Sequence, residues 1–497
     1  MRYFYFFATL VILGLAWACN PEDDFITDQG AQLEFSLDTL RFDTVFTEIG
    51  SATRILKVYN PHDQSIKIDK IMIREGASSV FRINIDGIPT AEASDVEIAA
   101  NDSLYIFGEV TVNPDQDFSI SPFVIEDAIM FLTNGNEQSV LLEAWGQNAN
   151  YIPSRFSKGE TNVFSCDFGE WVWDDPRPYV IFGLLVIDEC TLRMPPGTQV
   201  YVHGGLESTF VEDSVGNPVK VFFNDGRLIV GPQASLVIEG TVEEPVTVQG
   251  DRLEEDFGDV AGQWFGILLS PGSQGNRIEN AQIKNSIFGV AADSATELSL
   301  KNTQIFHTSS SAVIGIHAEI KAQNSLFFDN GASSVRLIYG GNYNFDYCSL
   351  GSYGVDASAL SVSNALCLDQ LCSRYRANNL NVQFRNSIIF GSRRDEIVLA
   401  SVPEADFNYG FENCIVKVDE LDDEGEFVDF FDQCVNCING ERDAALFADI
   451  DENDYRLDTL SIAEGMAIPL SNILLDLDGQ NRDPNMPDIG CYEYIIE

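Results

Sequence analysis

A short pattern that begins with Asn returns through the C-terminal half of the chain and limits the fold more than any other feature. It reads NAQIK at 280, NTQIF at 302, NSLFF at 324, NSIIF at 386 and NCIVK at 413. The first two steps are 22 residues each, Tyr347 takes the place of Asn 23 residues later, and the steps of 39 and 27 residues that follow contain insertions. A unit of about 22 residues cannot bury its apolar face alone, so the repeat predicts stacked coils.

The residues around each anchor alternate between apolar and polar, which indicates one strand before the anchor and another after it. Small residues follow the anchor directly, and large apolar residues stand three positions after it, as Ile283 and Ile305 do. Stacking like residues over like predicts a right-handed parallel β-helix, in which Cys348 and Cys414 are buried small residues. Each anchor is expected at a bend, in the left-handed conformation, with its amide bonded to the next coil. The structural repeat anchors are Asn280, Asn302, Asn324, Asn386 and Asn413.

The segment 31–152 carries a different pattern. Seven stretches with period-two alternation and β-branched or aromatic residues are separated by turn sequences such as NPHDQ and NGNEQ. This spacing predicts an immunoglobulin-like β-sandwich, in which His62 is a turn residue. The predicted fold class is therefore all-β. An N-terminal sandwich precedes a right-handed parallel β-helix over 160–440, and a capping segment follows over 441–497.

The N-terminus carries an export signal. One basic residue, Arg2, precedes an apolar run of 16 residues that ends at Ala18, which is shorter than the roughly 20 residues of a membrane-spanning helix. The stretch resembles a bacterial lipoprotein signal, which implies removal of 1–18, lipidation of Cys19 and a tether over 19–30. The acidic PEDD after Cys19 resembles the tract that directs some lipoproteins to the outer face of the outer membrane. A periplasm-facing lipoprotein and an uncleaved anchor remain alternatives.

Cysteine usage fits an oxidising compartment. Nine cysteines follow Cys19, so at least one is unpaired within the chain. Close spacing predicts two local disulfides, Cys367 with Cys372 and Cys434 with Cys437. A zinc site built from these four thiols is the alternative, and it is disfavoured because no His lies close to them in sequence.

The balance of charge excludes one class of partner. The chain has 29 Lys and Arg against 77 Asp and Glu, a net charge of −48, which repels nucleic acid. Two stretches, 419–432 and 449–458, concentrate the acids. The second places Asp449, Asp451 and Asn453 at the spacing of a calcium loop, but the Gly and the final Glu of such loops are missing. We expect solvated acidic loops and no cofactor, with calcium as the one weak metal candidate.

Several phrases resemble a family of exported bacterial β-helix lipoproteins with the pectin-lyase-like fold. They include GGNYNFDYCSL at 340–350 and the closing DIGCYEY, where Cys491 stands at a position that usually holds Ala. The resemblance covers roughly 165–495 and implies an architecture without a settled activity. The same fold also hosts pectate lyases and polygalacturonases, so an enzyme is an alternative.

The outward positions of the strand before the anchor argue against catalysis. Their carboxylates alternate with basic and amide groups, and His203, His307 and His317 are isolated in the sequence. Lys321, Asp346 and Arg385 are the residues where chemistry would be expected, and we predict that they form a cross-coil ladder of ion pairs instead. The favoured interpretation is a non-catalytic outer-membrane or cell-surface lipoprotein that serves as a binding, adhesive or scaffolding rod. The alternatives are a carbohydrate-active β-helix protein and an accessory subunit of an outer-membrane complex.

Overall fold

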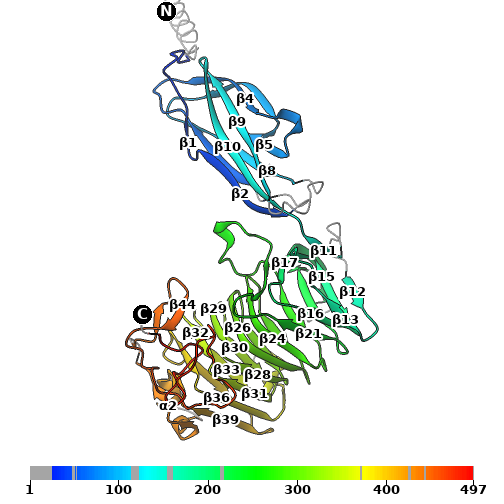
Figure 1. The fold of residues 1–497 in the computed structure, drawn as a ribbon, viewed down its shortest axis with the longest axis vertical. Helices are drawn as coiled ribbons and strands as arrows, with labels where there is room; N and C mark the ends of the chain where they lie inside the picture. The colour runs from blue at the N-terminus through cyan, green and yellow to red at the C-terminus, as the bar shows by residue number, and fades with distance from the viewer. Residues whose placement is uncertain are drawn as a thin grey trace, which may run out of the picture. The chain divides into compact units, whose positions relative to one another are not determined.

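The computed structural model describes residues 25–46, 51, 53–112, 123–153, 161–212, 218–369, 372–423, 427–441 and 444–495. These residues form two compact units that divide between Asn148 and Ala149 (Figure 1). The predicted signal peptide and Cys19 lie outside the described residues. In the described part, no helix combines the length and the apolar character that a membrane crossing requires.

The first unit is a β-sandwich of two five-stranded sheets. Alternate residues point inward, so that Leu56, Ile71, Ile106 and Phe131 are fully buried between the sheets. One sheet has the order β1 (Glu34–Phe35), β3 (Arg54–Tyr59), β8 (Ser103–Val110), β5 (Phe81–Ile85) and β6 (Ile88–Pro89). The other has the order β2 (Thr39–Phe46), β10 (Asn136–Gln147), β9 (Phe123–Thr133), β4 (Ile66–Ile73) and β7 (Glu92–Ile98).

The sandwich begins and ends earlier than the sequence suggests. The backbone N–H of Ile26 donates to the carbonyl of Ser65 at 2.9 Å, and its side chain packs against the sandwich core. The end of the predicted tether, 19–30, is therefore part of the sandwich. Asn150 already pairs with Tyr179 of the second unit in parallel, so the solenoid starts ahead of residue 160.

The second unit is the predicted parallel β-helix, with three strand positions in each full coil. β24 (Asn276–Lys284) and β26 (Glu297–Thr308) run through the bend at the anchor and serve two faces. The first face, before the anchor, contains β13 (Glu170–Val172), β16 (Thr191–Met194), β21 (Ser235–Glu239), β28 (Glu319–Gln323), β31 (Gly341–Asp346), β36 (Leu380–Arg385), β39 (Phe407–Glu412) and β41 (Cys434–Val435). The second face, after the anchor, contains β11 (Asn150–Ile152), β14 (Tyr179–Phe182), β17 (Gln199–His203), β22 (Val246–Gly250), β29 (Leu326–Asn330), β32 (Ser349–Ser352), β37 (Ile388–Gly391), β40 (Ile415–Val416) and β42 (Ile438–Asn439).

A separate nine-stranded sheet forms the third face. Its strands are β12 (Thr161–Ser165), β15 (Leu184–Asp188), β20 (Arg227–Val230), β23 (Gly266–Leu269), β25 (Val290–Ala292), β27 (Val313–Ile316), β30 (Val335–Ile338), β33 (Leu360–Ser363) and β38 (Ile397–Ala400). The registers match the alignment of the anchors, since Glu279 pairs with Lys301 and Lys301 with Gln323. Two antiparallel hairpins project from the coils: β18 (Leu206–Glu212) with β19 (Pro218–Asn224), and β34 (Ala365–Cys367) with β35 (Tyr375–Ala377).

The anchors occupy the bends between the first and second faces. The five Asn anchors and Tyr347 all have φ between 46° and 53°, the left-handed region that Asn tolerates better than other residues with a Cβ. Their amides have two kinds of partner. Asn302 donates to Oδ1 of Asn280, and Asn280 donates to the carbonyl of Gly240, both at 3.0 Å.

Among the described residues, the side chains of the later anchors form no hydrogen bond to the next coil. Asn324 donates to the carbonyl of Leu475 at 2.7 Å, Asn386 to that of Ile468 at 2.8 Å, and Asn413 to that of Met466 at 3.3 Å. The reason is that the C-terminal segment, residues 446–492, runs along these bends and offers its carbonyl groups there.

This C-terminal segment covers a flank of the β-helix. It contains a hairpin of β43 (Phe447–Asp449) and β44 (Asp454–Leu457), and it runs beside β29 and β32 (Figure 1). The outward side chains of these and later strands pack against it, including Leu326, Phe328, Ile388, Phe390 and Ile415. The segment predicted to cap the solenoid thus lies on its side.

The acidic stretch 419–432, which the sequence predicted as a solvated loop, is described over 419–423 and 427–432 and packs there onto the core of the solenoid. It contains α2 (Glu420–Asp423) and η4 (Phe430–Gln433). Phe430 is fully buried, and its ring stacks on Tyr409 with a centroid distance of 6.1 Å. Apolar residues within the stretch therefore pack onto the last coils.

Disulfides join Cys367 to Cys372 and Cys434 to Cys437, the two local pairs expected. A third disulfide, between Cys166 and Cys190, joins neighbouring coils and was not predicted. Cys348, Cys414 and Cys491 are free thiols, and all three are buried. Burial raises the pKa of Cys414 and of Cys491 to about 12, so these thiols are protonated at neutral pH.

Candidate binding groove on the second face

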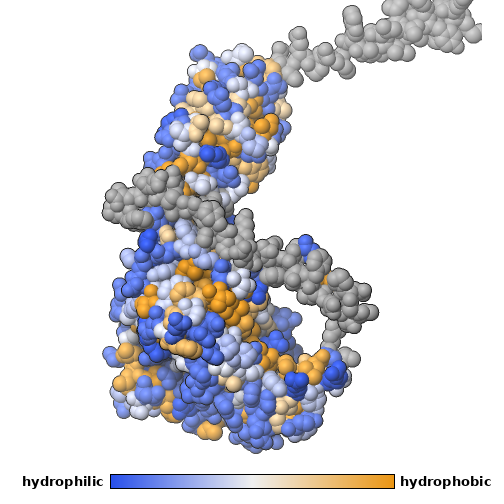
Figure 2. All heavy atoms as spheres, turned by 90° about the vertical axis from the view of Figure 1, so that its right-hand side faces the viewer, coloured by the Kyte–Doolittle hydropathy of each residue, from blue (hydrophilic) through white to orange (hydrophobic). Residues whose placement is uncertain are grey.

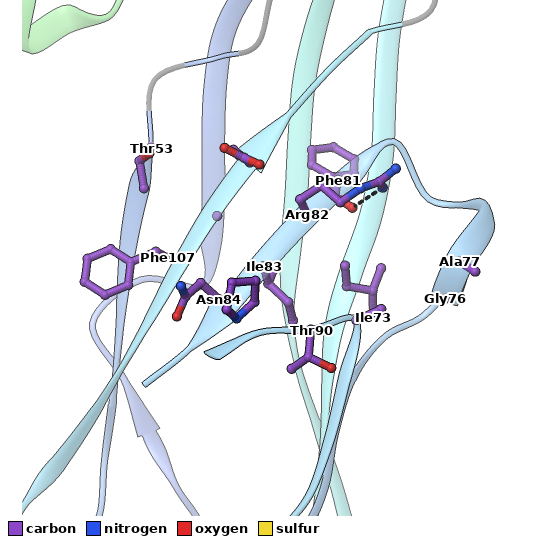
Figure 3. Close-up of a pocket in the computed structure, with 14 residues that line it drawn as sticks. Thr53, Ile73, Gly76, Ala77, Phe81, Arg82, Ile83, Asn84, Thr90 and Phe107 are labelled. Carbon is purple, nitrogen blue, oxygen red and sulfur yellow. Dashed lines mark hydrogen bonds between the residues drawn. The ribbon is translucent and has the colours of Figure 1, made fainter. Parts of the chain in front are cut away.

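The sandwich carries a hollow of about 790 Å³ over β5 and β8 (Figure 3). Its charged lining residues are Arg82 and Glu109. The backbone at the edge of β5 is already bonded, because Thr90 donates to the carbonyl of Ile83 at 3.1 Å and Phe81 donates to Ser79 Oγ at 3.1 Å. This hollow offers neither a cluster of titratable groups nor a free strand edge.

A second hollow, about 330 Å³, lies between the second face of the β-helix and the C-terminal segment. Amide, hydroxyl and charged groups dominate its lining. The lining residues are Thr241, Val242, Pro245, Asn280, Ala281, Gln282, Asn302, Gln304, Asn453, Asp454, Tyr455, Arg456, Leu477, Asp478 and Tyr492. We refer to this hollow as the amide groove.

The floor of the amide groove is formed by outward side chains of β24 and β26. Strand alternation buries Ile283 and Ile305 inside the coil and leaves Gln282 and Gln304 outside. These two Gln are register partners on neighbouring coils, and neither side chain has a hydrogen-bond partner among the described residues. Oδ1 of Asn302 is also buried without a partner. Three neighbouring amides thus retain hydrogen-bonding capacity beside the groove.

The opposite wall comes from β44 and the segment that follows it. Nε of Arg456 lies 2.8 Å from a carboxylate oxygen of Asp478, and Nη1 lies 3.4 Å from Asp454. The guanidinium also lies 5.6 Å from the ring centroid of Tyr492. The hydrogen bond to Asp478 is the main reason why the pKa of Arg456 is raised. The two carboxylates of this wall therefore share one cation.

Two of the three histidines that the sequence left isolated have carboxylate partners. His203 Nδ1 lies 2.5 Å from Asp251, and the His203 ring packs on Phe182. His307 is buried, with Nε2 at 3.1 Å from Asp259 and Nδ1 bonded to Asp329. The description of these residues as isolated was wrong, because Asp329 stands one repeat after His307 and the stacking of coils brings them together.

The third histidine, His317, packs near the ring of Tyr339 with a centroid distance of 5.6 Å. Its Nδ1 is buried without a hydrogen-bond partner in the described part. His62 behaves as a turn residue, with Nε2 at 3.0 Å from the carbonyl oxygen of Gln32.

The candidate residues of the first face, Lys321, Asp346 and Arg385, form ion pairs. Arg385 donates from Nε and Nη2 to both carboxylate oxygens of Asp346, at 2.7 and 2.8 Å. Lys321 pairs with Glu319 of its own strand at 2.6 Å. The predicted ladder of ion pairs through Lys321, Asp346 and Arg385 is wrong for Lys321, because Lys321 pairs with Glu319 and not with Asp346.

The weak calcium candidates lie at a hairpin turn. Oδ1 of Asp449 accepts hydrogen bonds from the backbone N–H groups of Asp451 and Glu452 at 3.1 and 3.3 Å, and Asn453 has a φ of 60°. Among the described residues, no group of three or more His, Cys, Asp and Glu side chains is arranged to hold a metal ion.

Sequence reasoning missed the amide groove because only the strand before the anchor was examined for outward residues. The signal was present. Gln282 and Gln304 both stand two positions after an anchor, in NAQIK and NTQIF. The wall formed by Arg456 and Asp478 has no such signal, since these residues belong to no repeat.

Comparisons with known proteins give only partial likenesses. No family model and no curated protein matches the chain. A protein of unknown function from Porphyromonas gingivalis W83 is 12% identical over 28% of this chain and 59% of its own, with a TM-score of 0.18. The catalytic unit of a GH87 α-1,3-glucanase from Streptomyces thermodiastaticus is 8% identical over 73% of this chain and 62% of its own, with a TM-score of 0.19. A family 123 glycoside hydrolase from Clostridium perfringens is 7% identical over 40% and 48%, with a TM-score of 0.19. The chain thus spans less than two thirds of the length of each of these three proteins.

Proposed function

We propose that this chain is a lipid-anchored, non-catalytic binding protein of the cell surface, and that the amide groove holds a glycan chain. The observation that carries the proposal is unused hydrogen-bonding capacity beside the groove, on the side chains of Gln282 and Gln304 and on Oδ1 of Asn302. Each of the two Gln amides offers two donors and an acceptor, the combination that sugar hydroxyl groups require.

The charged groups of the groove favour binding over cleavage. Glycoside hydrolysis needs one carboxylic acid that donates a proton and a second carboxylate that acts on the opposite side of the bond. Asp454 and Asp478 instead face the same guanidinium, that of Arg456. This shared ion pair suits a fixed wall that orients a ligand.

The surface location rests on the N-terminal signal and on cysteine chemistry. The three disulfides in the described part of the chain support an oxidising compartment. A partner protein in the outer membrane is the alternative, and a broad apolar patch would favour it. On the face drawn in Figure 2, apolar residues form small groups among hydrophilic ones.

The test is binding of the soluble protein, starting after Cys19, to a panel of neutral and acidic oligosaccharides by calorimetry. Gln304→Leu and Gln282→Leu should each weaken binding of a recognised glycan about 10-fold, the equivalent of one hydrogen bond of about 1.4 kcal/mol. Gln323→Leu is the matched control, because Gln323 is an outward amide on the first face. Equal loss in the control, or binding that ignores both groove variants, would contradict the proposal.

A further inference from the structure

The floor of the amide groove continues along the same two strands. Two residues after Gln282 and Gln304 stand Lys284 and Phe306, which are also register partners. Outward side chains on one strand are separated by roughly 7 Å, so Lys284 lies one outward position beyond the groove. A ligand that contacts both Gln side chains and extends along β24 meets the ammonium group of Lys284 next.

Lys284 is a cation without a carboxylate partner in a strongly acidic chain. Among the described residues it forms no ion pair, and its Nζ lies 5.8 Å from the ring centroid of Phe306. Its side chain is half-buried, and this burial lowers the pKa of Lys284 even though Asp259 acts in the opposite direction. Arg385 and Arg456, by contrast, each pair with a carboxylate on a neighbouring coil or segment.

Two nearby acids, Asp259 and Asp329, lie against the ring of His307. Nε2 of His307 lies 3.1 Å from a carboxylate oxygen of Asp259, and Nδ1 of the same ring bonds to Asp329. The imidazole therefore stands between the two carboxylates. In the described part of the chain, the ammonium group of Lys284 remains without a carboxylate partner.

We propose that Lys284 is a specificity-determining residue that binds an anionic substituent, a carboxylate or a sulfate, on the glycan held by the amide groove. The proposal rests on the proposed function of that groove. A half-buried ammonium interacts with an anion more strongly than one in open water, because the effective dielectric is lower. The net charge of −48 repels a densely charged polyanion, so the ligand carries its anionic groups sparsely.

The experiment compares soluble oligosaccharides of several backbones, each prepared in three forms: neutral, with one carboxylate, and with one sulfate. Dissociation constants are measured by calorimetry for the wild type, Lys284→Met and Lys284→Arg. Met keeps an unbranched stem over Phe306 and removes the charge, whereas Arg keeps the charge. Lys301→Met is the control, because Lys301 is an exposed cation on the first-face half of β26.

We expect at least one anionic form to bind the wild type about 10-fold more tightly than its neutral counterpart, a preference of about 1.4 kcal/mol. Lys284→Met should abolish that preference, while Lys284→Arg and Lys301→Met retain it. A preference that survives in Lys284→Met, or neutral forms that bind as well as charged ones, overturns the role of Lys284. If the neutral forms still bind in a manner that depends on Gln304, the proposed function stands. If no form binds through Gln304, both proposals fail.

Discussion

Nη2 of Arg482 donates to Oδ1 of Asn324 at 3.0 Å, although the two residues stand 158 positions apart in the chain. The guanidinium is almost fully buried, and it also bonds to the carbonyl of Gly490 at 2.9 Å and to Glu493 at 3.2 Å. The guanidinium carbon of Arg482 lies 3.9 Å from the ring centroid of Tyr347, the residue that replaces Asn at the following bend. One side chain thus connects the C-terminal segment to two consecutive bends of the solenoid.

Asn324→Ala is expected to lower the free energy of unfolding by about 1–3 kcal/mol, because it leaves a buried donor of Arg482 unpaired. Arg482→Met should cost more, roughly 3–5 kcal/mol, because it leaves the largely buried Glu493 carboxylate without its cation. Urea unfolding of both single variants and the double variant measures their coupling. Strict additivity would mean that the contact between Arg482 and Asn324 contributes nothing.

Stability should rise as the pH falls from 8.5 to 5.5, in part through Glu396. This carboxylate is fully buried and accepts backbone hydrogen bonds from Arg393 and Ala359. Burial raises the pKa of Glu396 from 4.5 to about 7, so its contribution is complete below pH 4.5 and is lost as the pH rises through 7. Between pH 5.5 and 8.5 the change amounts to about 2 kcal/mol.

The measurement for Glu396 is thermal unfolding across that pH range for the wild type and for Glu396→Gln. The variant stays neutral at every pH, so its slope should be shallower than that of the wild type by the amount that Glu396 contributes. Parallel slopes would show that the carboxylate is ionised in the folded protein at all of these pH values.

Cys19→Ser should move the full-length protein from the membrane fraction to the soluble periplasmic or secreted fraction. The reason is that the predicted lipid, and not a spanning helix, would hold the protein at the membrane. Fractionation followed by immunoblotting, with metabolic labelling by a palmitate analogue, checks this. A variant that stays with the membrane while labelling is lost points to an uncleaved anchor or a membrane-bound partner.

Removing the disulfide between Cys166 and Cys190 with two Ser substitutions should cost about 3 kcal/mol, the loop-closure scale for a separation of 24 residues. The pair Cys367 and Cys372 is the control, because its separation of 5 residues predicts a loss about 1 kcal/mol smaller. Denaturant unfolding under non-reducing conditions gives both values. Equal losses would show that loop length does not control the effect.

The first face is expected not to cleave polysaccharides. A lyase needs a base without a partner and fixed positive charge beside a uronate. Asp346 and Arg385 instead form an ion pair with each other. Incubation with acidic and neutral glycans, with and without calcium, should release no new reducing ends or unsaturated products. Turnover that disappears in Asp346→Ala, with folding intact, would place the protein among the enzymes.

The stacking of coils could be predicted because it depends on residues that repeat. The residue type and the spacing of Asn302 and Asn324 predict a bend at each position. The strand registers follow when equivalent residues of successive repeats are aligned. The same logic would have found the contact between His307 and Asp329, which are 22 residues apart, one repeat step. Asp259 could not have been found in this way, because it lies on an insertion.

The cover over the second face had a sequence signal of a different kind. Strands with one solvent-facing side alternate, but Leu326, Phe327 and Phe328 form a continuous apolar run, as do Ile388, Ile389 and Phe390. Such runs indicate burial on both sides. The sequence could not predict which segment covers the second face. Leu475 and Arg482 belong to no repeat, and their contacts depend on shape and hydrogen bonding in the folded protein.

Burial from both sides has a consequence for how the molecule is made. A simple solenoid can add coils one at a time, each resting on the last. Here β29 and β37 are synthesised before residues 446–492. Their outward side chains therefore remain uncovered until that later segment has been made. Until then these coils expose apolar side chains to other chains. Folding intermediates with exposed apolar surface are prone to aggregation. The middle coils and the C-terminal segment should therefore unfold as one cooperative unit. Their backbone amides should show similar protection from hydrogen exchange.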